Sequence, residues 1–143
     1  WRVAEGSNPE LSPDGKWVLF VKDGQIFRAA VDKAAQTDSM SRGLKPFIKE
    51  WGAQSSPRWS PDGSKLLFTS FFKTGFPDVF QYDVNSFQRT TFISFRGTNS
   101  GARYSPSGQQ VAVILSGEGT PEVYVTNAQG RAPQRRTRQF RDS

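Results

Sequence analysis

The sequence predicts an all-β protein: three four-stranded antiparallel blades that form part of a six-bladed β-propeller. The first observation is a turn that occurs three times, as Ser-Pro-Asp-Gly at residues 12–15 and 60–63 and as Ser-Pro-Ser-Gly at residues 105–108. Successive turns begin 48 and 45 residues apart, a period that is typical of propeller blades. The second observation is that an apolar run follows each turn. One repeat is therefore one blade, and three repeats predict three blades.

The residues of the turn explain its place in each blade. Proline presets φ for the second position of a type I turn, aspartate or serine bonds the backbone through its side chain, and glycine accepts a positive φ. The turn is therefore expected to join the first and second strands. In the first repeat, Asp23 and Gly24 form a two-residue hairpin signal, which predicts the connection between the second and third strands.

The strands are expected in the same order in every repeat. The first strands precede the turns, at residues 8–11, 56–59 and 101–104. The second strands are the apolar runs at residues 16–21, 65–70 and 110–116, which need cover on both faces. The third strands lie within residues 26–28, 76–83 and 120–127. The fourth strands, at residues 45–48, 89–93 and 133–137, carry the charge and proline of sheet edges.

These elements divide the chain into parts of one partial propeller, residues 1–143. The blades are expected at residues 8–48, 55–93 and 101–137, followed by a basic tail at residues 138–143. Residues 31–44 read as a long polar connection in the first blade. Propellers close with about four to eight blades. Three blades therefore predict either a fragment of a longer propeller or two copies that pair their open sides into a six-bladed ring.

Composition excludes several classes of function. The chain has no histidine and no cysteine, so Ser-His-Asp and Cys-His catalysis and the usual nitrogen or thiolate metal sites are excluded. The net charge of +6 is concentrated near the end of the chain, where residues 131–141 include five arginines. Nucleic-acid binding is not expected, because no second basic patch with interleaved aromatics accompanies them. No apolar stretch approaches the length of a membrane span.

The remaining polar motifs are interpreted as structural rather than catalytic. Asp14, Asp62, Asp78 and Glu122 recur at repeat positions, and such recurrence indicates turns and strand starts rather than one convergent catalytic site. The glycine-rich segment at residues 116–119 lies between two expected strands, whereas a phosphate-binding loop precedes a helix. The sequence therefore predicts no catalytic residue, no cofactor and no metal.

Three segments resemble the repeat of the TolB propeller family. They are Pro-x-Trp-Ser-Pro-Asp-Gly at residues 57–63, Pro-Asp-Val-Phe-x-Tyr-Asp at residues 77–83, and Gly-x-x-Pro-x-Arg-x-Thr at residues 130–137. The resemblance covers roughly residues 8–137. Arg136 replaces an apolar residue of the family pattern, Ser107 replaces its aspartate, and the first blade carries the long connection.

The resemblance implies a non-enzymatic interaction propeller of the bacterial envelope, located in the periplasm. It implies a protein or peptide partner, by family a Pal-like lipoprotein or TolA. Two alternatives remain open. The chain could be the accessory propeller of a peptidase or hydrolase whose catalytic domain is absent, or a self-assembling half-propeller whose partner is a second copy.

Propellers bind through loops at the rim of the ring. One set of loops joins consecutive blades, at residues 51–55 and 96–100, and the other joins second and third strands, at residues 71–76 and 117–120. Because strand direction alternates within a blade, both sets are expected on one face. The candidate partner-binding residues have the aromatic, arginine and polar character of interaction sites: Trp51, Gln54, Phe71, Phe72, Phe76, Arg96, Thr98, Asn99 and Arg103. Alternatively, Phe71 and Phe72 pack under the adjacent blade.

Overall fold

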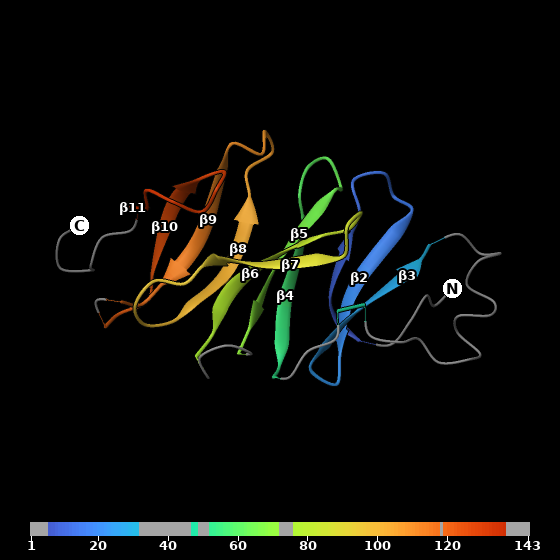
Figure 1. Ribbon diagram of the computed structural model, residues 1–143, viewed down its shortest axis with the longest axis horizontal. Coiled ribbons are helices and arrows are strands. Elements are labelled where there is room, and N and C mark those ends of the chain that lie inside the picture. The colour runs from blue at the N-terminus through green and yellow to red at the C-terminus, as the bar shows by residue number, and fades with distance from the viewer. Residues whose placement is uncertain (1–5, 32–46, 49–51, 72–75, 118, 137–143) are drawn as a thin grey trace.

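The structure is a computed structural model, and it describes residues 6–31, 47–48, 52–71, 76–117 and 119–136. Regular structure in these residues consists of β-strands, which form three antiparallel sheets. Figure 1 shows the sheets side by side in chain order, like the blades of an open fan. The ring is not closed. The predicted all-β partial propeller is therefore confirmed.

Each sheet follows the order of its strands along the chain. The first contains β1 (Ser7–Leu11), β2 (Trp17–Lys22) and β3 (Gln25–Ala30). The second contains β4 (Gln54–Trp59), β5 (Lys65–Ser70), β6 (Asp78–Asp83) and β7 (Gln88–Ile93). The third contains β8 (Asn99–Tyr104), β9 (Gln110–Leu115), β10 (Glu122–Asn127) and β11 (Gln134–Arg135).

The fourth strand of the first blade is the main departure from the predicted pattern. Of the expected residues 45–48, the structure describes only Phe47 and Ile48, which form a bend. The N–H of Phe47 donates to the carbonyl of Ile26 at 2.7 Å. The carbonyl of Ile48 instead accepts from the side chain of Gln54 at 3.1 Å, and the Ile48 side chain is buried in the core. The first sheet therefore has three strands, not four, within the described residues.

The three repeated turns are held in the same way. In each, the glycine N–H donates to the carbonyl of the leading serine at 2.9 Å. The hydroxyl of Ser60 donates to Oδ1 of Asp62 at 2.7 Å, and Ser12 makes the same bond to Asp14 at 2.6 Å. The N–H of Ser64, followed by the hydroxyls of Ser60 and Ser64, lowers the pKa of Asp62 to about 2. The ionised carboxylate therefore favours folding above its ordinary pKa of 3.8, and this contribution is lost as the pH falls towards 2.

Two apolar clusters join the sheets, one on each face of the second sheet. Leu19 and Ile26 of the first sheet pack with Trp59, Leu66, Phe68, Phe80 and Tyr82 of the second. Leu67, Val79 and Ile93 of the second sheet pack with Ala102, Val111, Val113 and Leu115 of the third. The second sheet is thus buried on both faces. This explains why its second strand is apolar at consecutive positions rather than alternating.

The outer faces of the first and third sheets differ in exposure. Leu19, Leu67 and Ala112 lie seven residues after the serine of their turns. Leu19 and Leu67 are fully buried, whereas Ala112 is exposed beside Ile114 and Val123. On the outer face of the first sheet, by contrast, Phe20, Phe27 and Ala29 are buried. The third sheet therefore carries the uncovered apolar face, and pairing of two copies stays a prediction.

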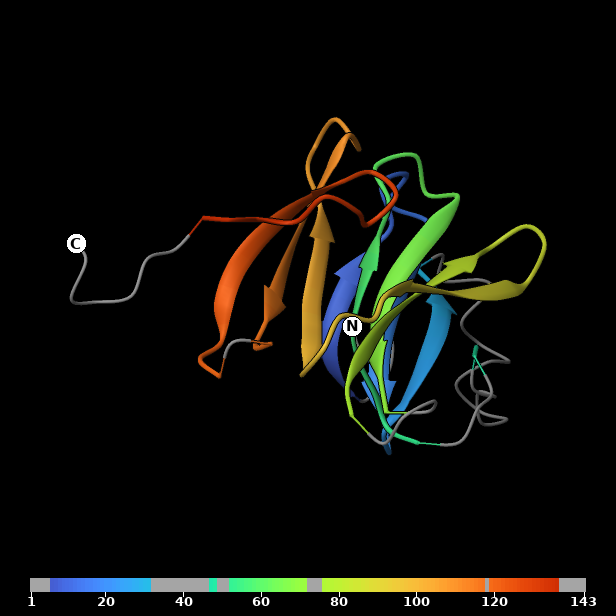
Figure 2. The same cartoon turned by 60° about the vertical axis from the view of Figure 1, so that its left-hand side comes forward.

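The β6–β7 hairpin carries an aromatic residue in a strained conformation. Phe87 has a φ of 60° and is 66% exposed, while Gly130 ends the corresponding turn of the third sheet with a φ of 76°. Figure 2 shows this hairpin projecting from the sheets. The left-handed conformation costs a non-glycine residue about 1–2 kcal/mol, and the exposed ring recovers little of that by packing. The turn therefore stores strain that a glycine would remove.

Phe87→Gly is expected to raise the free energy of unfolding by about 1 kcal/mol, because relief of strain exceeds the entropy that glycine adds to the unfolded chain. The midpoint of urea denaturation measures the change. Ser86→Gly is the matched control, because Ser86 has no positive φ to relieve, and it is expected to lower the midpoint. Equal losses in the two variants would show that Phe87 is not strained.

Candidate partner-binding site

The two sets of loops lie at the same end of the sheets, as the alternation of strands predicts. In the second sheet, Ser70 pairs with both Gln54 and Asp78, so the loops before β4 and after β5 meet there. The N–H of Asn99 donates to the carbonyl of Pro77 at 2.8 Å. We call this end the loop face: residues 52–54, 71, 76–77, 94–99, 116–117 and 119–121. In Figure 1 it runs along the lower edge, and the repeated turns run along the upper edge.

Large apolar side chains are exposed on the loop face. Phe71 is 42% exposed, Phe76 is 64% exposed and Phe95 is 40% exposed. Arg96, next to Phe95 in the chain, is also exposed. Phe71, Phe76 and Arg96 are predicted site residues, whereas Phe95 is a residue that the sequence reasoning missed. The sequence feature that could have identified Phe95 is its position just after a fourth strand and one residue before the junction at residues 96–100.

Asn99 holds the blade junction together from inside. Its side chain is fully buried. Its Oδ1 accepts from the N–H of Phe95 at 2.9 Å, and its Nδ2 donates to the carbonyl of Phe95 at 2.9 Å and to Oδ1 of Asp78 at 3.0 Å. This amide therefore fixes the segment that presents Phe95 and Arg96, and it positions the loop rather than facing solvent.

Gln54 has the same role one blade earlier. It lies six residues before the serine of its turn, as Asn99 does, and it is 2% exposed. Its Oε1 accepts from the N–H of Ile26 at 2.7 Å, and its Nε2 donates to the carbonyl of Ile48. The bond to Ile26 ties the second blade to the first. The predicted site residues Gln54 and Asn99 are therefore both buried supports of the loop face.

Thr98 lies where two loops pack against each other. Its N–H donates to Oγ of Ser116 at 3.0 Å, and the two hydroxyls are hydrogen-bonded. A Cβ on Gly117 would lie 2.7 Å from the carbonyl oxygen of Arg96, so only glycine fits without a shift of the backbone. The junction at residues 96–98 is therefore braced by the following hairpin.

Three predicted residues do not join this arrangement in the described structure. Trp51 and Phe72 lie outside the described residues. Arg103 lies near the other end of β8, one residue before the end of that strand, and not beside Arg96. The sequence reasoning grouped Arg103 with Arg96 by proximity along the chain. The six-residue strand between the loop and the turn places Arg103 away from the loop face.

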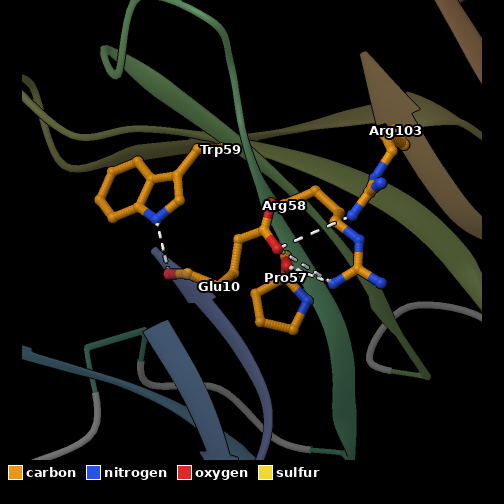
Figure 3. Close-up of polar contacts among 5 residues, drawn as sticks. All are labelled: Glu10, Pro57, Arg58, Trp59 and Arg103. Atoms are coloured by element: carbon orange, nitrogen blue, oxygen red, sulfur yellow. Dashed lines mark hydrogen bonds and ion pairs between the residues drawn. The ribbon is translucent and has the colours of Figure 1, made fainter. Parts of the chain in front are cut away.

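Arg103 instead belongs to a set of charges on the first strands of the sheets. Glu10, Arg58 and Arg103 each lie two residues before the serine of their turns, and β4 packs against both β1 and β8. Oε2 of Glu10 lies 3.6 Å from Nη1 of Arg58 and 3.8 Å from Nη2 of Arg103. Figure 3 shows both guanidinium groups approaching the Glu10 carboxylate from the same side. The indole of Trp59 also donates to the backbone carbonyl of Glu10 at 3.0 Å.

These three residues form an inner-strand charge cluster with one carboxylate for two cations. The Arg103 side chain is 61% exposed, so its pair with Glu10 is screened by water and adds little stability. Its guanidinium remains accessible to an incoming acceptor. The signal for the cluster was present in the sequence, because each repeat has a charged residue at the same position, but the sign changes between repeats.

The described residues contain no group of three or more histidine, cysteine, aspartate or glutamate side chains able to hold a metal ion. Among the same residues there is no helix long and apolar enough to cross a membrane.

Comparison with known proteins identifies the family. A family model described as the TolB beta propeller domain matches residues 47–141, more than half of the chain. The chain belongs to this family. TolB of Roseobacter denitrificans, a Tol-Pal system protein, is 42% identical over 103 residues, which cover 69% of this chain and 23% of the relative. TolB of Alcanivorax borkumensis is 39% identical over 64 residues, or 45% of this chain and 15% of the relative.

Solved structures share the fold of this TolB propeller segment. The crystal structure of TolB from Acinetobacter baumannii matches with a TM-score of 0.71 and 22% identity, over 94% of this chain and 33% of that one. A puromycin hydrolase matches with a TM-score of 0.68 and 15% identity, over 93% of this chain and 23% of that one. At such identities the likeness shows the fold alone. The segment spans less than a quarter of the two curated TolB relatives and a third of the solved TolB chain.

Proposed function

We propose that this chain is a non-enzymatic interaction module, the part of a TolB-type propeller that binds a protein partner through its loop face. The observation that carries this proposal is the exposure of Phe71, Phe76 and Phe95 on one braced face of the molecule. Exposed aromatic groups of this kind mark interaction surfaces, and aromatic and arginine side chains supply much of the binding energy at protein interfaces.

The hydrogen bonds that fix the loops beneath these exposed aromatic side chains favour tight binding. The buried amides of Gln54 and Asn99 and the pairing of Thr98 with Ser116 hold the loops before a partner arrives. A preformed surface loses less conformational entropy on binding than a mobile one. Burial of one phenylalanine side chain contributes about 1.5–3 kcal/mol, so the three exposed rings together supply a substantial part of the free energy that must offset the cost of association.

The partner we propose is a Pal-like lipoprotein or TolA, in the periplasm. This part of the proposal follows from the family and from relatives that are named as Tol-Pal system proteins. Trp51 and Phe72 are proposed as further contacts by their place in the same loops. Arg103 is proposed to contact only a partner segment that reaches the inner strands.

The accessory propeller of a hydrolase is a second reading that the shared fold leaves open. The fold is common to enzymes and to interaction proteins, so it does not decide between them. The exposed aromatic groups of the loop face favour the interaction module.

Phe76→Ser is expected to weaken binding to the soluble domain of a Pal-like lipoprotein at least about tenfold, because it removes one apolar anchor from the interface. Isothermal titration calorimetry measures the affinity. The midpoint of thermal unfolding should change little, because the side chain is 64% exposed.

Phe87→Ser is the matched control, because Phe87 is equally exposed but lies on the β6–β7 hairpin, away from the loop face. It is expected to leave the affinity unchanged. Equal losses for both variants, or no loss for Phe76→Ser, would contradict the proposed binding face.

A further inference from the structure

A pocket of about 380 Å³ lies between the repeated turns of the first two sheets, on the side opposite the loop face. Its lining includes Asp14, Trp17, Arg28, Trp59 and Asp62. The two turns touch there: a Cβ on Gly63 would lie 3.7 Å from the Pro13 ring. The proposed function does not use this pocket. Its volume lies in the range of sites that bind small molecules.

Arg28 is the unusual member of the pocket. Its guanidinium carbon lies 4.1 Å from the centre of the Trp17 ring and 4.4 Å from that of Phe47. Burial lowers the pKa of this guanidinium, because removal of water disfavours the charged form. Within the described part of the chain, no carboxylate or hydrogen-bond acceptor pairs with it. Aromatic contacts hold the group in place, and among the described residues no acceptor occupies its N–H donors.

The next pocket along the propeller provides an internal comparison. It measures about 320 Å³ and lies between the turns of the second and third sheets. Gln81 takes the place of Arg28 there, since Gln81 pairs with Leu67 as Arg28 pairs with Leu19. The Gln81 side chain donates to the hydroxyl of Tyr104 at 2.5 Å. The equivalent donor is therefore satisfied across the blade interface, which leaves Arg28 as the exception.

Two carboxylates line the same pocket as Arg28. Asp14 and Asp62 use Oδ1 within their own turns, and these bonds lower the pKa of both groups. Both are therefore ionised at neutral pH. In the described structure no bond engages Oδ2 of either residue. Two fixed negative charges disfavour a dianion such as phosphate, so the ligand that matches the pocket carries one charge of each sign.

We propose that this pocket binds a zwitterion of the α-amino acid class, either a free amino acid or a short peptide with both ends free. The ligand carboxylate pairs with the Arg28 guanidinium, whose planar fork suits two parallel hydrogen bonds. The ligand ammonium group pairs with Asp14 and Asp62, and its apolar body packs on the Trp17 and Trp59 rings. The ligand thus supplies a carboxylate for the Arg28 guanidinium and an ammonium group for the carboxylates of Asp14 and Asp62.

Nuclear magnetic resonance titration of the labelled chain, followed at the indole N–H signals of Trp17 and Trp59, tests this proposal. The probes are L-leucine, N-acetyl-leucine, which keeps only the carboxylate, and leucinamide, which keeps only the cation. Leucine is expected to give saturable shifts, and each capped probe to bind at least about tenfold more weakly, because each loses one charge-assisted pairing. The dipeptide leucyl-leucine distinguishes the two sources: tighter binding than leucine assigns the site to peptides.

Two variants test which charged side chain pairs with which end of the ligand. Arg28→Gln installs the side chain of the neighbouring pocket and is expected to weaken leucine binding at least about tenfold. Asp14→Ser installs the residue that the third turn uses and is expected to weaken leucine and leucinamide but not N-acetyl-leucine. Arg131→Gln, at an exposed position, is the control. Equal affinity for leucine and its capped forms, unchanged affinity in Arg28→Gln, or no saturable shift would overturn the proposal.

Discussion

Phe68→Ala is expected to lower the free energy of unfolding by about 3–5 kcal/mol, the range measured for truncation of a buried phenylalanine. Phe68 is 1% exposed in β5, and its ring centre lies 5.8 Å from that of Phe80. It belongs to the cluster that joins the first two sheets. Alanine leaves a cavity that strand ladders on both sides prevent from collapsing, so the chain loses transfer free energy and packing together.

Urea denaturation followed by circular dichroism measures the Phe68→Ala loss. Phe87→Ala is the control, because Phe87 is 66% exposed and its removal opens no cavity. A loss below about 1 kcal/mol for Phe68→Ala, a value ordinary for surface positions, would show that the two sheets do not share a packed core.

Asn99→Leu is expected to lower the free energy of unfolding by about 2–4 kcal/mol, since each buried polar group left without a partner costs about 1–3 kcal/mol. Leucine has the same number and branching of side-chain heavy atoms as asparagine but cannot accept from the N–H of Phe95 or donate to its carbonyl. The buried Asp78 carboxylate also loses one donor. Affinity for the partner should fall as well, because the segment that presents Phe95 and Arg96 loses its anchor.

Chemical denaturation and calorimetry with the Pal-like domain measure the two effects of Asn99→Leu. Asn85→Leu, at an exposed position of the β6–β7 hairpin, is the control and should change neither. Retained stability with reduced affinity would contradict the positioning role, because it would make Asn99 a direct contact rather than a buried support.

The fold could be predicted from the sequence because its signals are local. A Ser-Pro-x-Gly turn specifies its own geometry, and the three copies adopt one hydrogen-bond pattern. The consecutive apolar residues at 65–70 required cover on both faces, and two neighbouring sheets provide it. The sequence signals of edge strands are weaker, because only a few backbone hydrogen bonds decide whether such a strand forms. This is why residues 47–48 form a bend and β11 has only two residues.

The candidate site could be predicted only in outline. Alternating strand direction was enough to place the two sets of loops on one face. The polarity of Gln54 and Asn99 predicts contact with a partner. Only the packing of consecutive blades shows that their side-chain amides form hydrogen bonds inside the protein instead. The pairing of Glu10 with Arg58 and Arg103 joins positions 48 and 93 residues apart. Such contacts depend on how consecutive sheets are arranged in space, which no short stretch of sequence determines.

Amide shift mapping of the isotope-labelled chain, titrated with the unlabelled soluble domain of a Pal-like lipoprotein, tests the proposed binding face most directly. The largest changes are expected at Phe71, at Phe76 and at residues 95–98, where the exposed aromatic groups lie on their braced loops. Changes confined to the repeated turns at residues 12–15, 60–63 and 105–108, or no change at saturating partner, would contradict binding through the loop face.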